Sequence, residues 1–161
     1  MMETLIEYDN YKFLITDAPT NSNLLSYIQL WQKYHIRNVI RLCDSTYDEI
    51  LVSQKGIQIH DLSFHDGTFP NHSILNKWKH IIISNMDSCI GIHCIAGLGR
   101  APLLVSLTLI ELGIDNLESI KIIREKRPGA LNTQQLRYIK KYKPKIKLNK
   151  EKSKIEKCII S

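Results

Sequence analysis

The sequence lacks a hydrophobic run long enough to cross a membrane. Its apolar uncharged stretches, residues 88–99 and 101–110, have 12 and 10 residues, whereas a spanning helix needs about 18 or more apolar residues. The first residues are acidic and contain no apolar run of the signal-peptide type. We therefore expect a protein that begins its life in the cytosol.

Cysteine is also scarce. The chain has four cysteines, which are Cys43, Cys89, Cys94 and Cys158. In a cytosolic protein such cysteines are thiols by default, so a disulfide framework is not expected.

Basic charge is sparse over most of the chain, although the formal net charge is +6. Residues 137–157 hold ten basic and two acidic side chains, a local balance of +8. Residues 1–136 hold 12 basic and 14 acidic side chains and are close to neutral. A protein that coats nucleic acid needs basic residues spread over a broad face. We therefore expect no nucleic-acid partner.

The hydrophobic pattern predicts a single α/β domain over residues 1–142, with a central, mostly parallel sheet and helices on both faces. The predicted strands are residues 4–8, 13–16, 39–43, 57–62 and 89–93. One predicted helix is capped by Asn23, another begins at Ser73, and the others span residues 47–54, 101–112, 116–126 and 133–142. The helix at 101–112 is apolar on all sides, which indicates burial in the middle of the domain. Pro144 is expected to end regular structure, leaving residues 143–161 as a polybasic tail.

The most informative segment is a loop between the strand at 89–93 and the buried helix. Cys94 and Arg100 flank it, with His93 just before and Gly97 and Gly99 inside it. Such a loop can turn its backbone N–H groups toward an anion, and the helix that follows directs its positive end to the same point. The planar guanidinium group of Arg100 can donate hydrogen bonds to two phosphate oxygens at once. We expect residues Ile95, Ala96, Gly97, Leu98, Gly99 and Arg100 to bind phosphate.

The same surroundings favour the thiolate form of Cys94, because helix N-termini and cations acidify thiols. A thiolate beside a phosphate site is a nucleophile for phosphoryl transfer through a cysteinyl phosphate. Two other interpretations fit poorly. A dinucleotide fingerprint would need glycine where Pro102 stands. A zinc site is disfavoured because His93 and Cys94 point to opposite sides of a strand. We expect no metal or cofactor.

The reaction also needs an acid that protonates the leaving oxygen. Asp66 follows a predicted strand and precedes Gly67, which can serve as a hinge, so Asp66 is our candidate general acid. His65 is the rival candidate. A loop aspartate is more often a solvated turn residue, and the assignment of Asp66 depends on the neighbouring phosphate loop.

The segment from His93 to Pro102 resembles the signature of the protein tyrosine phosphatases. Its Ala-Gly-Leu-Gly-Arg-Ala-Pro form is similar to the PRL subgroup, the phosphatases of regenerating liver, also called type 4A. Further matching segments are residues 13–21, 41–48, 64–67, 127–136 and 158–161. The resemblance implies a dual-specificity phosphatase fold with Cys94 as nucleophile, Arg100 as phosphate clamp and Asp66 as general acid. It also implies supporting roles for His93 and Gln135.

Other implications rest on the resemblance alone. Cys43 is expected to form a disulfide with Cys94 under oxidation, whereas from the residues alone Cys43 is a buried small hydrophobe. Ala101 stands where most such phosphatases have Ser or Thr, whose hydroxyl assists breakdown of the cysteinyl phosphate, so a slow enzyme is expected. The subgroup also binds CNNM-type magnesium transporters through this loop, and homo-oligomers occur among its members.

This chain departs from the subgroup at Leu62-Ser63, in place of Trp-Pro, and at His65, in place of an aspartate.

The last four residues, Cys158-Ile159-Ile160-Ser161, form a C-a-a-X motif, and serine at the last position favours farnesylation of Cys158. One lipid chain anchors weakly, and the +8 segment just upstream supplies a second signal for an anionic leaflet. We expect a protein on the cytoplasmic face of the plasma membrane or endomembranes, or in the cytosol when unprenylated.

Two functions therefore compete. The first is a membrane-associated, cysteine-dependent phosphatase that acts on phosphoproteins or phosphoinositides. The second is a binding module with a phosphatase fold that regulates a CNNM-type magnesium transporter. The sequence keeps Cys94, Arg100 and Asp66, which favours the enzyme.

Overall fold

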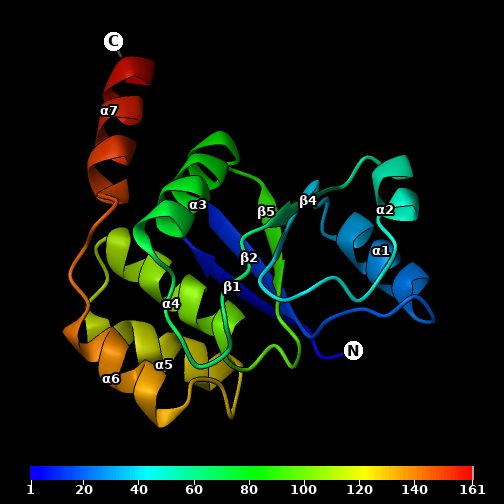
Figure 1. Cartoon of the computed structure of the whole chain (residues 1–161). Coiled ribbons are helices and arrows are strands. Elements are labelled where there is room, and N and C mark those ends of the chain that lie inside the picture. The colour runs from blue at the N-terminus through cyan, green and yellow to red at the C-terminus, as the bar shows by residue number, and fades with distance from the viewer. Residues whose placement is uncertain (161) are drawn as a thin grey trace.

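The computed structural model describes residues 1–160, apart from the side chain of Lys152. A five-stranded sheet in the order β1-β2-β5-β3-β4 forms its centre (Figure 1). The strands are β1 (Thr4–Tyr8), β2 (Tyr11–Thr16), β3 (Asn38–Arg41), β4 (Gln58–Asp61) and β5 (Cys89–His93). The hairpin of β1 and β2 is antiparallel, and the pairs β2·β5, β5·β3 and β3·β4 are parallel. The predicted α/β fold with a mostly parallel sheet is confirmed.

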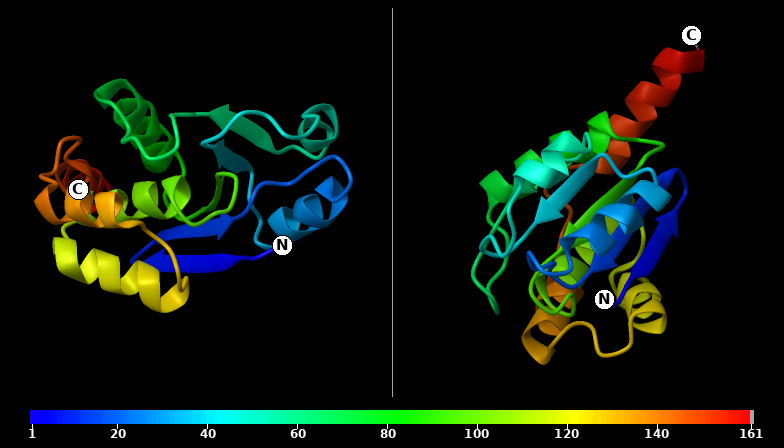
Figure 2. Two further views of the ribbon diagram at one scale, coloured as in Figure 1. Left: turned by 60° about the horizontal axis from the view of Figure 1, so that its bottom comes forward. Right: turned by 90° about the vertical axis from the view of Figure 1, so that its right-hand side faces the viewer.

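Helices cover both faces of the sheet (Figure 2). One face carries α1 (Leu24–Lys33) and the short α2 (Ile50–Gln54). The other face carries α3 (His72–Ser84), α4 (Arg100–Glu111), α5 (Asn116–Lys126) and α6 (Thr133–Lys141). Successive strand residues alternate between the two cores: Val39 packs toward α1 and Ile40 toward α4. This alternation follows from the two-residue period of a strand and explains why the buried strands are apolar throughout.

Helix α4 lies in the middle of its layer, and all twelve of its residues are buried. Its polar side chains bond within the core: Trp78 Nε1 donates to Thr108 Oγ1, and the hydroxyls of Ser106 and Ser119 lie 2.9 Å apart. The prediction of a buried central helix is confirmed. Because α4 is fixed on every side, its N-terminus at Arg100 has a defined position relative to the sheet edge.

Three local predictions differ from the structure. The helix predicted over 47–54 begins only at Ile50, because Tyr47 turns into the core instead. Asn23 precedes α1 but does not cap it; its Oδ1 accepts a hydrogen bond from the Thr20 N–H. Helix α3 begins one residue before Ser73, at His72, because Asn71 Oδ1 accepts the Ile74 N–H.

The prediction that regular structure ends at Pro144 is wrong. A further helix, α7 (Leu148–Ile160), projects from the body (Figure 1). The segment before it is tied to the core, since Ile146 and Leu148 are buried. The buried carboxylate of Glu111 accepts hydrogen bonds from the Tyr142 hydroxyl and from the backbone N–H groups of residues 145–147. The segment between α6 and α7 has too few apolar residues for the sequence to predict that it packs against the core. No helix within residues 1–160 is long and apolar enough to span a bilayer.

Candidate active site

Strand β5 delivers Cys94 to the carboxyl edge of the parallel strands, where open α/β folds bind their ligands. The chain then forms a loop over residues 95–99, here called the phosphate loop, and enters α4 at Arg100. Cys94 itself is buried, with 3% of its surface exposed. The strand, loop and helix therefore stand in the predicted order.

The carbonyl groups of the phosphate loop point outward to donors in the surrounding body. Ala18 N–H donates to Ile95 O at 2.9 Å, and Leu131 N–H donates to Leu98 O at 2.8 Å. In a trans peptide the carbonyl and the next N–H point in opposite directions. Hence the N–H groups that follow these carbonyls face the inside of the loop. They line up with the positive end of α4, an arrangement suited to an anion.

Arg127 braces the loop from behind. This side chain is 1% exposed; its Nε donates to Gly97 O and its Nη1 donates to Thr4 Oγ1 at 2.8 Å. Gly97 has a φ of +69°, and a Cβ there would lie 2.4 Å from the Arg127 Nη2 and 2.5 Å from Thr16 O. Only glycine fits this position. The sequence offered no signal of the bracing contacts of Arg127 beyond its place in the matching segment 127–136.

Gln135 supports the other end of the loop. It is fully buried in the first turn of α6, where it forms a capping box with Asn132. A Cβ on Gly99 would lie 3.3 Å from Gln135 Nε2, so the amide stands next to the loop. Nε2 is buried and has no hydrogen-bond partner among the described residues. This free donor beside the loop agrees with a supporting role.

Arg100 points back from α4 across the sheet edge. Its Nη1 donates to Leu42 O at 2.9 Å and to Phe64 O at 3.1 Å. Its Nε lies 3.6 Å from Asp66 Oδ1, which is an ion-pair distance and too long for a hydrogen bond. The guanidinium therefore links the β3 end, the loop after β4 and the start of α4.

The segment after β4, residues 62–71, is here called the acid loop. Asp66 occupies a turn in which the Thr68 N–H donates to His65 O at 3.0 Å, and Gly67 adopts a φ of +77°. The Asp66 side chain is 79% exposed, and His65 is exposed as well. Phe69 anchors the far end by stacking on Tyr138 of α6, with ring centroids 3.9 Å apart. Asp66 and Arg100 are thus brought together.

A hollow of about 570 Å³ lies between the acid loop and Arg100. Phe64, His65, Asp66, Phe69 and Asp44 are among the residues that line it, and Cys94 is not. The hollow therefore opens over the guanidinium and the candidate acid, with the thiol deeper in the fold. It offers space for a substrate group next to the phosphate loop.

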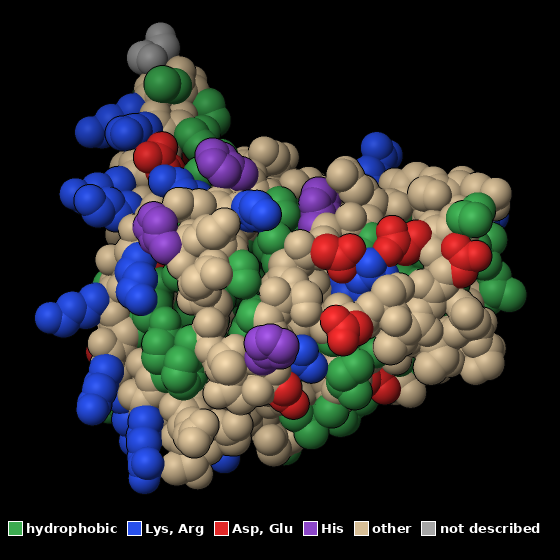
Figure 3. Space-filling model, in the orientation of Figure 1, with side chains coloured by type: hydrophobic (Ala, Val, Ile, Leu, Met, Phe, Trp, Pro, Cys, Tyr) green, Lys and Arg blue, Asp and Glu red, His purple; other side chains and the backbone are tan. Residues whose placement is uncertain are grey.

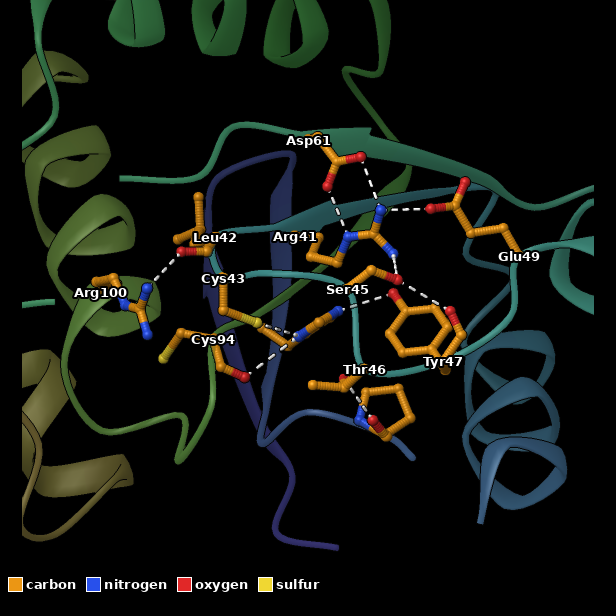
Figure 4. A network of polar contacts seen from close by, with 12 residues as sticks. Arg41, Leu42, Cys43, Ser45, Thr46, Tyr47, Glu49, Asp61, Cys94 and Arg100 are labelled. Carbon is orange, nitrogen blue, oxygen red and sulfur yellow. Dashed lines mark hydrogen bonds and ion pairs between the residues drawn. The ribbon is translucent and has the colours of Figure 1, made fainter. Parts of the chain in front are cut away.

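A polar chain fixes His93 behind Cys94 (Figure 4). Its Nε2 lies 2.9 Å from the Tyr47 hydroxyl, and its Nδ1 lies 3.2 Å from Cys94 O. Tyr47 packs under the guanidinium of Arg41, which pairs with Asp61. Burial lowers the pKa of His93 to about 4, so the imidazole is neutral at pH 7. A neutral ring donates from one nitrogen and accepts at the other, which matches a bond to Cys94 O and one from Tyr47.

Cys43 lies beside this chain, with its sulfur 3.9 Å from His93 Nδ1. In Figure 4 the sulfur of Cys94 points toward Arg100 and that of Cys43 points away from it. Both are free thiols here. Burial raises the pKa of Cys43 to about 11, so this thiol is protonated at neutral pH. The Cys43–Cys94 disulfide stays a prediction, although the two residues are neighbours.

Comparison with known proteins places this site in a family. The chain is 40% identical over 160 residues to the PRL-1 phosphatase of Drosophila melanogaster, covering 97% of this chain and 91% of that protein. It is 41% identical over 147 residues to human protein tyrosine phosphatase type IVA 3, covering 89% and 85%. The chain belongs to the PRL family of protein tyrosine phosphatases. A scan against protein-family models gave no match.

Solved structures show the same fold. A putative protein tyrosine phosphatase from Leishmania major superposes with a TM-score of 0.80 at 41% identity, covering 89% of this chain and 99% of that one. PTPMT1 in complex with PI(5)P has a TM-score of 0.69 at 20% identity, covering 94% and 98%, and shows the shared fold. The protein is therefore a cysteine-dependent protein tyrosine phosphatase with a phosphatase fold.

The structure brings together the predicted PRL residues Cys94, Arg100 and Asp66, with His93 and Gln135 behind them. Cys158 lies far from them, near the end of the projecting helix, and is exposed. Ser161 of the motif lies outside the described residues. The structure shows where the three residues that depart from the PRL pattern lie. Leu62 is buried in the main core, while Ser63 and His65 are exposed.

Proposed function

We propose that the protein hydrolyses phosphate monoesters, above all phosphotyrosine in proteins, through a cysteinyl phosphate on Cys94. The observation that carries this proposal is the phosphate loop, whose outward carbonyls leave its N–H groups facing inward between Cys94 and Arg100. Phosphoryl transfer depends mainly on positioning and on stabilising the charge of the transferred group. Phosphoinositides are the alternative substrate class.

In the first step the Cys94 thiolate attacks phosphorus and the bond to the leaving oxygen breaks. Arg100 and the loop N–H groups hold the equatorial oxygens, and Asp66 gives its proton to the leaving oxygen. In the second step water attacks the phosphocysteine, Asp66 takes a proton from that water, and the sulfur leaves as thiolate. Gln135 Nε2 is buried beside Gly99 and has no hydrogen-bond partner within the described residues 1–160, which supports a role in holding that water.

The test compares leaving groups. Cys94→Ser should abolish turnover of every substrate, because a hydroxyl in this setting is not ionised. Asp66→Asn should lower kcat/KM by about 10²-fold or more for an alkyl phosphate and far less for a nitrophenyl phosphate, whose leaving group needs no proton. Equal losses on both substrates would contradict the role of Asp66.

We further propose that hydrolysis of the phosphocysteine is slow. Ala101 is fully buried at the start of α4 and offers no hydroxyl to this step. A rapid burst of product equal to one turnover should precede a slow steady state, and Ala101→Ser should raise the steady rate. A linear time course from the first turnover would contradict the proposal.

We propose that the enzyme works at a membrane. The support is the +8 segment, residues 137–157, which runs from α6 into α7 and precedes the exposed Cys158. Intact mass from cells should show a farnesyl group, and Cys158→Ser should move the protein to the soluble fraction. Retention of Cys158→Ser on membranes at low and high salt would argue against lipid anchoring.

A second candidate function is docking to a CNNM-type transporter through the phosphate loop. Its support is Ile95, which is 53% exposed at the rim beside the nucleophile and is followed by the exposed Ala96. Large apolar side chains at such rims favour protein contacts. Ile95→Asp should abolish capture by the transporter's CBS-pair domain while Leu25→Asp, at an exposed position on α1, should not. No capture by the wild type would end this candidate.

A further inference from the structure

Strand β4 forms one margin of the sheet, here called the β4 margin, and leads directly to the active site. It pairs with β3 on one side, and no further strand of the described chain lies beyond it (Figure 2). The residues that follow it run into the acid loop, where Ser63 and Phe64 line the hollow over Arg100. An edge strand with unpaired backbone groups is a template for a further strand. At the β4 margin this template is continuous with the active site.

Alternate residues of β4 direct their backbone groups away from β3. The N–H of Leu62 donates to Arg41 O at 3.0 Å, and the N–H of Gln58 donates to the carbonyl just before β3 at 2.8 Å. The even-numbered residues therefore face β3. Because successive backbone N–H groups of a strand point to opposite edges, the N–H and C=O groups of Ile59 and Asp61 face outward. They have no hydrogen-bond partner among residues 1–160.

A recess lies beside the β4 margin where the strand begins. Its volume is about 340 Å³, and its lining includes Ser53 of α2, Gly56, Ile57 and Ile59. The hollow over Arg100, of about 570 Å³, lies just past the other end of the strand. Four residues of strand separate the two by about 13 Å. An extended chain along the β4 margin can therefore place side chains in both.

The surface along the β4 margin is acidic. Arg41 pairs with both Glu49 and Asp61, yet these two carboxylate side chains stay 47% and 56% exposed. Asp44, which lines the hollow over Arg100, is exposed and forms no ion pair with any residue in the range 1–160. Asp and Glu side chains gather over β4 and α2, away from the Lys and Arg side chains over α6 and α7 (Figure 3). The charge of the β4 margin thus complements a chain with basic side chains.

We propose that the β4 margin binds the substrate protein as an added strand. An extended segment that contains Lys or Arg, on one side of the phosphotyrosine, pairs with the outward groups of Ile59 and Asp61, and the phosphotyrosine enters the hollow over Arg100. Backbone pairing supplies affinity with little demand on sequence, whereas the acidic surface selects basic segments. The inference rests on the proposed phosphatase function, because the docked segment is part of the substrate.

The first test uses the wild-type protein and a phosphotyrosine peptide with Lys and Arg on both flanks. One backbone nitrogen at a time is methylated, which removes a single donor. On one flank, methylation of alternate residues should lower kcat/KM about tenfold, because a backbone hydrogen bond is lost. Methylation of the residues between them should leave kcat/KM unchanged. Equal losses at successive residues, or no loss on either flank, would overturn the proposal.

The second test removes a donor from the protein. Ile59→Pro deletes an outward N–H and leaves the hydrogen bonds to β3 in place, as proline does on an edge strand. Ile59→Ala is the matched control, because it also loses the side chain but keeps the N–H. On the unmethylated peptide, Ile59→Pro should have a kcat/KM about tenfold lower than Ile59→Ala, whereas the two should hydrolyse nitrophenyl phosphate equally. Equal values on the peptide would count against strand pairing.

The preference for basic segments has its own test. A peptide with Glu in place of each Lys and Arg should show a kcat/KM at least about tenfold lower at low salt, and added salt should shrink the difference. Equal use of the two peptides would show that the acidic surface selects nothing.

Binding to Cys94→Ser separates docking from catalysis. This variant should bind the unmethylated peptide, and its dissociation constants should show the same alternation along one flank. Turnover of nitrophenyl phosphate by wild type without alternation in either assay would reject the docking and retain the phosphatase function. Alternation in binding without any turnover by wild type would do the reverse. A wild-type dimer that Ile59→Pro dissociates, with no alternation in the peptides, would assign the β4 margin to a second copy of the chain and overturn the proposal.

Discussion

The phosphate loop and the acid loop lie on opposite sides of Arg100, and the fold holds them very differently. Around the phosphate loop, the carbonyls of Ile95, Gly97 and Leu98 each have a donor from another part of the chain. Near Asp66 the acid loop is held by an internal turn, the Arg100 Nη1 bond to Phe64 O, a 3.6 Å ion pair and one aromatic stack. The half of the site that binds phosphate is therefore preorganised, while the half that moves a proton is held by few contacts.

The two loops contain matched glycines that make this contrast measurable. Gly97 and Gly67 both have positive φ, but a Cβ on Gly97 meets Arg127 and Thr16 at 2.4 to 2.5 Å, and a Cβ on Gly67 meets nothing within 4 Å. Gly97→Ala should lower the free energy of unfolding by about 3 kcal/mol, from backbone strain and overpacking together, and abolish turnover. Gly67→Ala should cost about 1 kcal/mol and leave turnover within a small factor.

Urea unfolding and initial rates on an aryl phosphate check both variants. A Gly67→Ala variant that is as damaged as Gly97→Ala would show that the acid loop is as tightly held as the phosphate loop, and the comparison would fail.

The sequence predicted one loop better than the other for a physical reason. Cys94, Gly97 and Arg100 lie within seven residues between a strand and a helix, so local pattern was enough to place them. The bracing contacts come from Arg127 and Thr4, which are far apart in the chain and converge only through the fold. Tyr47 shows the same limit: it was expected to start a helix, whereas its hydroxyl lies 2.9 Å from His93 Nε2 in the core. Tertiary contacts of this kind override local propensity.

Arg127 gives the next largest expected effect. Arg127→Met removes the donors to Gly97 O and Thr4 Oγ1 from a buried site. The loop carbonyl then loses its partner, which should weaken orthovanadate binding by about 10- to 100-fold. Arg124→Met, at an exposed position on α5, is the control and should leave the affinity unchanged. Unchanged affinity in Arg127→Met would show that the phosphate loop needs no brace from behind.

His93 sharpens the comparison through pH. Its pKa is about 4 in the folded protein because burial disfavours the charged ring, against about 6.5 in the unfolded chain. Between these values the unfolded chain binds a proton that the folded one does not, so the free energy of unfolding falls as pH falls from 6.5 to 4, by about 3 kcal/mol in all.

His93→Asn should remove this dependence, and urea unfolding at a series of pH values measures it. Half-buried His60, whose pKa is also lowered by burial, contributes the same slope to both proteins and cancels in the difference. Parallel curves for wild type and variant would mean that His93 is not held neutral behind the phosphate loop.

The smallest expected effect tests the weakly held side. Phe69→Ala removes the stack on Tyr138, a contact worth about 0.5–1.5 kcal/mol, and frees the far end of the acid loop. We expect kcat for an alkyl phosphate to fall two- to tenfold, in proportion to that energy, with orthovanadate affinity unchanged because the phosphate loop is untouched. Tyr138→Phe keeps the ring and should behave like wild type. If Phe69→Ala weakened orthovanadate binding as much as it lowered kcat, the two loops would be one coupled unit rather than a rigid cradle facing a loosely held acid.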